Sequence, residues 1–326
     1  MIITRSPLRV TLGGGGTDLP SYSRRFGGFA ITAAIDKYVF VTVTRPFAPG
    51  IYLKYSQLEK VERVSQVQHP IIREALALLD SSTPQIEITT LADIPAGTGL
   101  GSSGSFTTAL LKALSTHQRM ILPPKALADL ACEIEITRLH EPTGRQDQYA
   151  AAFGGVTCFD FNPDDSVDAR PLALAYEPLH QLEDNLVLFF TGFTRRAGEI
   201  LQEQDARTAA DDGVMLAHLH YVKELGIRSR MALEAGRLEE FGELLHEHWE
   251  HKKKRSSGMS NAQVDEWYEL ARKSGALGGK LVGAGGGGFL FFYTERARPV
   301  REAMQKAGLQ ELRFRFDLEG TKVLFS

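Results

Sequence analysis

Residues 95–105 have the composition of a loop that binds an anion: Pro-Ala-Gly-Thr-Gly-Leu-Gly-Ser-Ser-Gly-Ser. Alternating apolar residues before the loop, including Ile86 and Ile88, predict a half-buried strand, and apolar residues at helical spacing over 106–114 predict a helix after it. Backbone N–H groups at a helix start have no partner within the helix, and the helix dipole favours negative charge there. Because glycine lets a ligand approach such a backbone closely, the stretch predicts a phosphate site.

The same glycine pattern has other interpretations. Residues 99–104 fit the G-x-G-x-x-G pattern of dinucleotide-binding folds, but that fold needs an acidic residue at a second strand end about twenty residues further on. Residues 122–131 predict instead a loop followed by a helix. A P-loop would end in Gly-Lys-Ser/Thr, and the first lysine after the loop is Lys112. A glycine loop with a purely structural role stays open, and a phosphate cradle of another kind is favoured.

Asp147 is the candidate proton acceptor. It follows a predicted helix that carries Glu135 and Arg138, and that Pro142 and Gly144 terminate. An aspartate placed beside a phosphate site can take a proton from an attacking hydroxyl. The alternative is a helix-capping aspartate, and the local sequence does not choose between the two.

Two further glycine clusters lie far from this loop in the sequence. Residues 13–16 follow a predicted strand, and residues 283–288 lie between Lys280-Leu-Val282 and Phe289-Leu-Phe-Phe292. The second cluster also fits G-x-G-x-x-G, but a strand rather than a helix follows it. Either cluster alone is typical of a hairpin or a bulge. Three clusters in separate regions predict that distant segments meet at one ligand.

The run His246-Glu-His-Trp-Glu-His251 suggests a metal site, but it does not match H-E-x-x-H. The side chains of His246 and His248 fall on different faces of a helix, which argues against shared coordination. The basic run 252–255 after it is interpreted as a solvated face. The alternative is that it lends one cation to a phosphate.

Composition narrows the class of protein. A chain of 326 residues predicts two domains, and a net charge of −3 argues against nucleic acid or membrane surfaces as partners. Cys132 and Cys158 are the two cysteines, which fits a reducing compartment. The N-terminus has no signal-peptide pattern, and the longest apolar runs, 186–190 and 289–293, are too short to span a bilayer. We therefore expect a soluble cytoplasmic protein.

The order of predicted elements places a boundary near residue 180. Before it we expect strands at 10–12, 38–43 and 51–55 and a helix at 69–79. After it we expect a strand at 186–190, helices to about 273, and strands near 280–293 and 312–316.

With these motifs in view, the chain resembles the GHMP kinase superfamily. Its three family motifs appear in order at 6–12, 95–105 and 280–288. The resemblance implies an α+β fold, with a domain similar to ribosomal protein S5 domain 2 over 1–180 and a ferredoxin-like domain over 181–326. It also implies that ATP lies between the two domains.

The resemblance assigns roles to particular residues. Asp147 matches the catalytic aspartate, Arg9 matches the basic residue beside it, and Ser103 and Glu135 match positions that hold Mg²⁺. The family usually has alanine where Gly104 stands; this costs about 1 kcal/mol of helix propensity and leaves the phosphate role intact. The residues expected to hold ATP are Gly97, Thr98, Gly99, Leu100, Gly101, Ser102, Ser103 and Gly104.

The first motif narrows the branch of the superfamily. Where galactokinases carry Gly-Glu-His-Thr-Asp-Tyr, this chain has Gly14-Gly-Gly-Thr-Asp-Leu-Pro-Ser-Tyr22. That version, with segments 190–195, 249–252 and 275–280, resembles the D-glycero-α-D-manno-heptose 7-phosphate kinases, with L-fucose kinases next. The implied reaction is ATP-dependent phosphorylation of the anomeric O1 to the 1,7-bisphosphate, on the way to nucleotide-activated heptose.

A sugar phosphate needs cations around its own phosphate, preferably the forked guanidinium of arginine. Two arginine pairs, 24–25 and 195–196, are candidates, and we favour the second because it follows a predicted strand end. Asp18 is expected to hold sugar hydroxyls. The full set of expected substrate-binding residues is Gly15, Gly16, Thr17, Asp18, Arg195, Arg196, Gly285, Gly286 and Gly287.

Two alternatives stay open. A kinase for an unphosphorylated sugar such as fucose would need no second anion pocket. A non-catalytic ligand-binding relative is the other, although the presence of Asp147, Ser103 and Glu135 argues against it. The expected small-molecule partners are a sugar phosphate and ATP with Mg²⁺, and the oligomeric state is left open.

Overall fold

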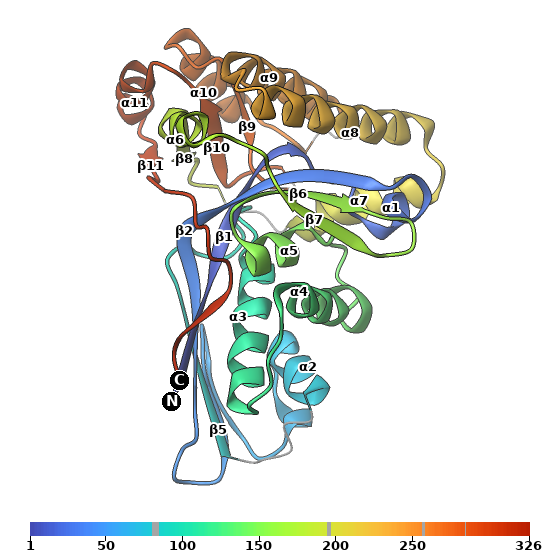
Figure 1. Cartoon of the computed structure of the whole chain (residues 1–326), viewed down its shortest axis with the longest axis vertical. Coiled ribbons are helices and arrows are strands. Elements are labelled where there is room, and N and C mark those ends of the chain that lie inside the picture. Colours follow the sequence, from blue (N-terminus) through green and yellow to red (C-terminus); the bar gives the residue numbers. More distant parts are fainter. Residues whose placement is uncertain (80–84, 194–196, 256–257, 284) are drawn as a thin grey trace.

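The computed structural model describes residues 1–79, 85–193, 197–255, 258–283 and 285–326 (Figure 1). The strands are β1 (Ile2–Gly14), β2 (Gly28–Thr44), β3 (Gly50–Lys54), β4 (Leu58–Val61), β5 (Gln85–Ala92), β6 (Val156–Phe161), β7 (Val167–Pro171), β8 (Leu186–Phe190), β9 (Gly278–Leu281), β10 (Phe289–Tyr293), β11 (Gln310–Glu311) and β12 (Lys322–Phe325). The α-helices are α1 (Pro20–Phe26), α2 (Pro70–Leu78), α3 (Ser102–His117), α4 (Pro124–Cys132), α5 (Gln146–Phe153), α6 (Tyr176–Asn185), α7 (Ala197–Ala209), α8 (Gly213–Glu234), α9 (Leu238–Arg255), α10 (Ala262–Lys273) and α11 (Ala297–Lys306). A 3₁₀ turn spans Val64–Gln66 and a π-helical turn spans Glu133–Arg138.

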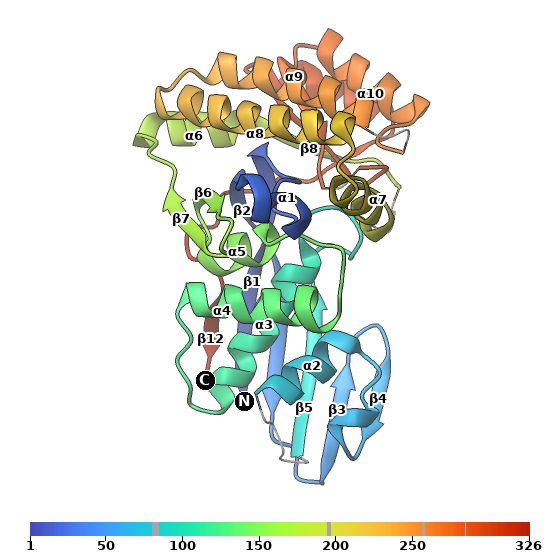
Figure 2. The same ribbon diagram turned by 90° about the vertical axis from the view of Figure 1, so that its right-hand side faces the viewer.

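The first sheet has eight strands in the order β12-β1-β2-β5-β3-β4, with β6 paired to β2 and β7 to β6. The 17-residue β2 organises it, because residues 39–44 pair with β5 and residues 28–33 pair with β6. The helix α3 packs on β1 and β2, with α2 and α4 beside it (Figure 2). These helices bury one face of the sheet and bring the loop before α3 next to β1.

The second sheet has four antiparallel strands in the order β11-β8-β10-β9. The helix α9 packs on β9, and α8 lies between α9 and the strands β1 and β2 of the first sheet. One hydrophobic cluster contains Leu8, Val10 and Leu12 of β1 together with Leu188 and Phe291 of the second sheet. The two sheets therefore share a core, and the expected α+β class is confirmed.

Most expected elements are confirmed: the strands predicted at 10–12 and 38–43 lie within the longer β1 and β2, and the strand predicted at 51–55 corresponds to β3 at 50–54. The helix expected at 69–79 is α2, and the strand expected at 186–190 is β8. The boundary expected near residue 180 falls within α6, and the division into two domains there stays a prediction. In the described part of the chain, no helix is both long and apolar enough to cross a bilayer.

The strand expected at 312–316 is wrong. Only β11 and a single bridge between Phe316 and Ile35 form in this region. The reason is that the segment leaves one sheet for the other: Leu312 N donates to Leu188 O, whereas Asp317 N donates to Ala34 O. The chain then ends as β12, paired with β1 in the first sheet.

Candidate active site

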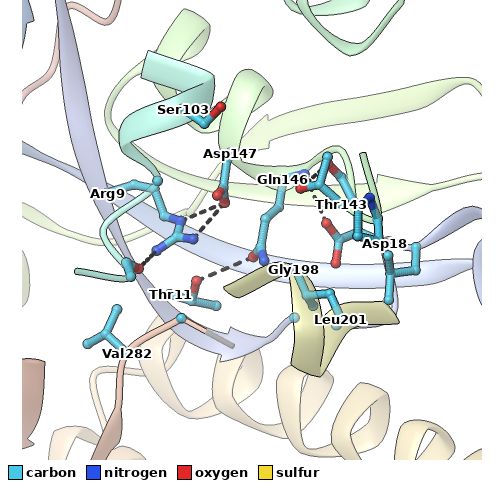
Figure 3. A pocket seen from close by; sticks show the side chains of 18 of the residues that line it. Arg9, Thr11, Asp18, Ser103, Thr143, Gln146, Asp147, Gly198, Leu201 and Val282 are labelled. Carbon is cyan, nitrogen blue, oxygen red and sulfur yellow. Dashed lines mark hydrogen bonds and ion pairs between the residues drawn. The ribbon is translucent and has the colours of Figure 1, made fainter. Parts of the chain in front are cut away.

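A cavity of about 360 Å³ lies where the two sheets meet (Figure 3). Its walls come from β1 and the glycine turn after it, the loop before α3, the π-helical turn, the start of α5, α9, and the end of β9. The alternation of β1 explains one wall. Leu8, Val10 and Leu12 enter the core, so Arg9 and Thr11 on the opposite face line the cavity.

The loop before α3 has the backbone of an anion cradle. Gly97, Gly99 and Gly101 have φ values of 79°, 84° and 78°, which L side chains rarely adopt. A Cβ at Gly99 would lie 2.7 Å from Val282 O, so only glycine fits beside this strand end. These glycines, Ser102 and Ser103 line the cavity, and the first turn of α3 opens onto it. Unpaired N–H groups there favour an anionic ligand.

Three of the expected ATP-binding residues do not line the cavity. Thr98 and Leu100 belong to the loop, but both are buried. Gly104 lies at the crossing of α3 and α5, where a Cβ would approach Asp147 C and Gln148 N to 2.9 Å. Glycine at 104 therefore lets the two helices pack closely.

Asp147 lies in the first turn of α5 and pairs with Arg9. Arg9 Nε donates to Asp147 Oδ1 over 2.7 Å, and Arg9 Nη1 donates to Gly99 O over 2.6 Å (Figure 3). The N-cap of α5 is Arg145, whose side chain makes no capping bond, so Asp147 is not the capping residue. Arg9 is only 4% exposed, whereas the side chain of Asp147 is 23% exposed. Its carboxylate can therefore reach a ligand while Arg9 holds it beside the loop.

Glu135 comes from the π-helical turn, a local irregularity that is frequent at functional sites. Ser103 Oγ donates to Glu135 Oε2 over 2.6 Å. The side chain is 2% exposed, burial raises the pKa of its carboxyl, and Oε1 has no hydrogen-bond partner among the described residues. A buried carboxylate oxygen without a donor, beside a hydroxyl, fits a bound cation. Mg²⁺ is typically held by one or two carboxylates plus substrate phosphates.

Asp18 is buried next to the glycine turn that follows β1. Its Oδ2 accepts a hydrogen bond from Gln146 N over 3.1 Å, and burial raises the pKa of its carboxyl. Gly144 lies so close to Asp18 that any side chain there would collide with the carboxylate. Gly15, Gly16 and Asp18 line the cavity.

Thr17, predicted with them, is buried and is not among the residues that line the cavity. Its Oγ1 accepts from Phe29 N over 3.0 Å, which ties the turn to β2.

Among the described residues of the third glycine cluster, Gly283 alone lines the cavity. Gly286 N donates to Met259 O over 3.1 Å, and Gly287 packs against Phe193. Gly285, Gly286 and Gly287 are thus not among the lining residues, although their neighbour Gly288 packs directly on Thr98 and supports the phosphate loop.

The expected arginines are placed only in part. Arg195 and Arg196 lie outside the described residues. Arg24 pairs with Asp165 over 2.9 Å and Arg25 with Asp211 over 2.5 Å. Arg24 and Arg25 both line a more open cavity that adjoins the first.

Sequence reasoning did not assign His248 or Lys280 to the site, and for the run that begins at Lys252 it offered a cation for a phosphate only as the alternative. His248 and Lys252, one helical turn apart on α9, line the cavity together with Lys280 of β9. Lys252 Nζ donates to Leu281 O over 3.0 Å and also to Gly283 O, so a solvated face is wrong for this lysine. The available signal was a lysine directly before the apolar residues 281–282.

The histidine run does not form a metal site in the described part of the chain. His246 Nδ1 lies 2.7 Å from the hydroxyl of Tyr268, and His251 stacks on Tyr221. Among the described residues, no three His, Cys, Asp or Glu side chains gather as metal ligands.

Comparisons with known proteins agree with this geometry. Residues 70–155 match the GHMP kinases N terminal domain, and residues 230–310 match the GHMP kinases C terminal domain. A D-glycero-alpha-D-manno-heptose 7-phosphate kinase from Campylobacter jejuni is 30% identical over 98% of this chain and 98% of its own. An L-fucokinase/L-fucose-1-P guanylyltransferase from Bacteroides fragilis is 29% identical over 89% of this chain and 34% of its own. The crystal structure of a D-glycero-D-manno-heptose 1-phosphate kinase from Bacteroides thetaiotaomicron superposes with a TM-score of 0.82 at 28% identity, covering 100% of this chain and 99% of that one.

Proposed function

The chain belongs to the GHMP kinase superfamily, and from this premise we propose that it transfers the γ-phosphoryl group of ATP to the anomeric O1 of D-glycero-α-D-manno-heptose 7-phosphate. The observation that carries the chemistry is Asp147, held by Arg9 against the glycine loop. The observation that carries the substrate is the full-length similarity to a heptose 7-phosphate kinase.

The ATP phosphates would lie on the glycine loop. Gly97, Gly99 and Gly101 present backbone without side chains, and the start of α3 adds unpaired N–H groups. Apolar side chains of Pro70, Ile71 and Leu139 line the cavity and offer a surface for the base.

Ser103 and Glu135 would hold the Mg²⁺ that accompanies ATP. The buried, unpartnered Oε1 of Glu135 supports this assignment. When bound, the metal would offset charge on the phosphates. The role of the protein is to keep the Ser103 hydroxyl and the Glu135 carboxylate side by side at the start of α3.

Asp147 would accept the proton of the O1 hydroxyl. As O1 bonds to the γ-phosphorus, the bond from that phosphorus to the ADP oxygen breaks, ADP leaves, and the proton ends on an Asp147 carboxylate oxygen. Arg9 orients this carboxylate through its Nε and compensates part of the negative charge that gathers around it. Catalysis of this kind depends mainly on positioning and charge.

The sugar would lie along the turn after β1. Gly15 and Gly16 leave room for a hydroxylated ring, and the Asp18 carboxylate offers it an acceptor. The free, buried thiols of Cys132 and Cys158 and the use of ATP fit a cytoplasmic reaction that feeds nucleotide-activated heptose synthesis.

A kinase for unphosphorylated L-fucose is the second candidate, supported by the similarity to the L-fucokinase/L-fucose-1-P guanylyltransferase of Bacteroides fragilis. The deciding experiment measures ATP consumption with heptose 7-phosphate, the same heptose without phosphate, L-fucose and D-galactose. We expect the highest kcat/KM with heptose 7-phosphate, and ³¹P NMR should show a new phosphate on the anomeric carbon. Faster turnover of L-fucose would reject the heptose assignment. If ATP is consumed with no sugar of this panel, the result would support a non-catalytic relative.

A further inference from the structure

Lys280 is a buried cation that the reaction described above does not use. It lies on β9, its residue is 3% exposed, and it lines the cavity. Its Nζ lies 3.5 Å from the carbonyl oxygen of Leu12 and 3.4 Å from His248 Nδ1. In the part of the chain that the structure describes, no carboxylate forms an ion pair with it.

The environment of Lys280 disfavours its charge in the absence of a ligand. Burial lowers its pKa to about 7, and the guanidinium of Arg9 acts in the same direction. Removing an ammonium from water without a counter-charge is costly. The exposed arginines considered for the sugar phosphate differ in this respect, because Arg24 and Arg25 each carry an aspartate partner.

Among the residues that the structure describes, the hydrogen-bonding capacity of Lys280 is also incomplete. A charged lysine has three N–H donors. Leu12 O and His248 Nδ1 can accept two of them, and this second bond places the proton of a neutral His248 on Nε2. The third donor is left for a ligand in the cavity that Lys280 lines.

We propose that Lys280 binds a phosphate group of a bound substrate, and that His248 positions its ammonium. The inference rests on the proposed function, which supplies two such groups: the phosphate carried by the sugar and the γ-phosphoryl group of ATP. Either one provides the negative charge and the acceptor oxygen that the described residues do not provide at Lys280. Lysine suits this role because its ammonium is a compact point charge.

The test compares the wild type with Lys280→Met, which keeps the length of the side chain and removes its charge. Lys112→Met is the matched control, since Lys112 also buries its stem and donates to a carbonyl, Leu122 O, but lies on α3 away from the cavity lining. For each protein, kcat and KM are measured for ATP, for heptose 7-phosphate and for the heptose without phosphate. Circular dichroism first establishes that each variant is folded.

The two phosphate sources give different results. If Lys280 binds the sugar phosphate, KM for heptose 7-phosphate rises about tenfold to a hundredfold, the preference over the bare heptose falls by the same factor, and KM for ATP is unchanged. If it binds the transferred phosphoryl group, turnover of both sugars falls by one common factor. Values within about twofold of the wild type for every parameter of a folded Lys280→Met protein would overturn the inference.

A second measurement needs no substitution. At pH 8, binding of a phosphate to Lys280 would recharge the amine, so calorimetric titration of the wild type with heptose 7-phosphate, or with an unreactive ATP analogue, in two buffers of different ionisation enthalpy should show proton uptake. If neither ligand causes proton uptake on binding, the inference would be overturned. Lys280→Gln, which keeps a donor for Leu12 O, serves if the Met variant does not fold. A wild type that is inactive toward heptose 7-phosphate would overturn the proposed function as well; an active wild type with unaffected variants would overturn only the role of Lys280.

Discussion

Arg9 Nε lies 2.7 Å from Asp147 Oδ1, while the same guanidinium reaches Gly99 O through Nη1. One buried side chain of β1 thus connects the start of α5 to the glycine loop before α3. Because the loop and the aspartate are both tied to Arg9, a phosphate on the loop, as proposed above, would lie in a defined position relative to the carboxylate. Such fixed geometry is what phosphoryl transfer requires from a protein.

Replacing Asp147 by asparagine should lower kcat by roughly 10²–10⁴-fold, because the amide keeps the shape of the side chain but cannot accept the O1 proton. The dissociation constant for ATP should change little. Steady-state kinetics and calorimetric ATP binding provide the two measurements. Asp168→Asn, at an exposed position of β7, is the control. A kcat close to that of the wild type would show that the proton leaves by another route.

Substitutions at the proposed metal ligands should change the requirement for Mg²⁺. In Ser103→Ala and in Glu135→Gln, one of the two adjacent oxygen ligands is lost or loses its charge. The Mg²⁺ concentration that gives half-maximal activity should rise by roughly tenfold or more. Activity is measured over a Mg²⁺ titration at saturating ATP. An unchanged titration midpoint in both variants would move the metal site elsewhere.

Gly101→Val should abolish ATP binding, because Gly101 has a φ of 78° at the N-cap of α3 and an added Cβ would lie 3.1 Å from Arg9 Cγ. The protein is first checked for folding by circular dichroism, and ATP binding is then measured by calorimetry. Normal ATP affinity in the folded variant would rule out the loop as the phosphate site.

Gly104→Ala should destabilise the protein by about 1–3 kcal/mol, although alanine is the better helix former. The reason is that the new methyl group would lie 2.9 Å from the backbone of α5. Gly213→Ala is the matched control, because Gly213 begins α8 and a Cβ there meets nothing within 4 Å. The free energy of unfolding is measured by urea denaturation. A Gly104→Ala protein as stable as the control would mean that α3 and α5 separate at little cost.

The stability contributed by position 280 should depend on pH. The pKa of Lys280 is about 7 in the folded protein, well below the value of 10.5 expected in the unfolded chain. Between these values the unfolded state binds more protons, so the free energy of unfolding rises with pH, and below about pH 7 this dependence disappears. Arg9 of β1 and His248 of α9 act on Lys280 directly, and Lys252 of α9 lines the same cavity.

Urea denaturation at pH 7, 8 and 9 should therefore show a free energy of unfolding that increases more steeply in the wild type than in Lys280→Met. Parallel pH profiles would mean that Lys280 titrates normally in the folded protein.

A feature of the fold or of the site could be predicted from the sequence when it depends on residues that are near one another in the chain. The strand–glycine loop–helix arrangement over 85–117 was predictable because strand alternation, glycines and a helix start adjoin one another within about thirty residues, each governed by local preferences. Asp147 and Glu135 were identified by their resemblance to family positions, while the local sequence left Asp147 undecided. The motif order also predicted the superfamily, which the comparisons confirmed.

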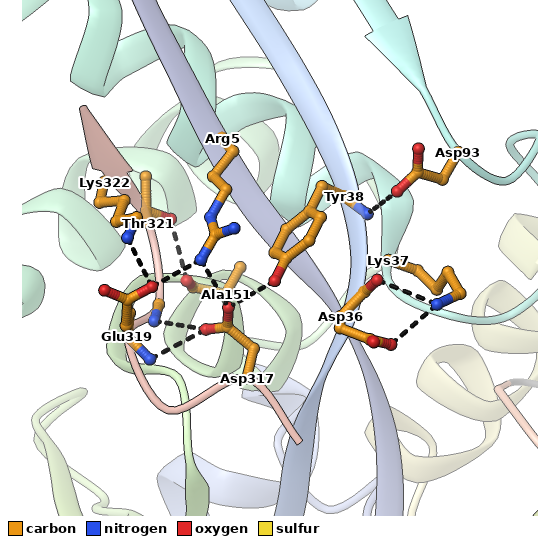
Figure 4. Close-up of polar contacts among 11 residues, drawn as sticks. Arg5, Asp36, Lys37, Tyr38, Asp93, Ala151, Asp317, Glu319, Thr321 and Lys322 are labelled. Carbon is orange, nitrogen blue, oxygen red and sulfur yellow. Dashed lines mark hydrogen bonds and ion pairs between the residues drawn. The ribbon is translucent and has the colours of Figure 1, made fainter. Parts of the chain in front are cut away.

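The tertiary structure decided which residues meet. Asp317 illustrates this: its carboxylate accepts hydrogen bonds from Tyr38, from Arg5 and from the backbone of Gly320 (Figure 4). Arg5 and Asp317 are 312 residues apart in the sequence. They meet where the last strand, β12, returns to pair with β1. No local pattern around 312–316 indicates that the segment changes sheets, because its hydrogen-bond partners are chosen by the packing of both sheets.

Tertiary packing also decided the places of the two lysines and of the third glycine cluster, whereas local preferences decided the loop before α3. Whether Lys252 and Lys280 face water or a cavity depends on how α9 packs on β9. Gly283 lines the cavity beside Gly99, whereas Gly285 packs against Met259, and this difference also depends on tertiary packing. Local propensities determine that a strand, a loop or a helix forms. The burial of a charge and the convergence of distant segments are properties of the shared core, which forms only when both sheets pack together.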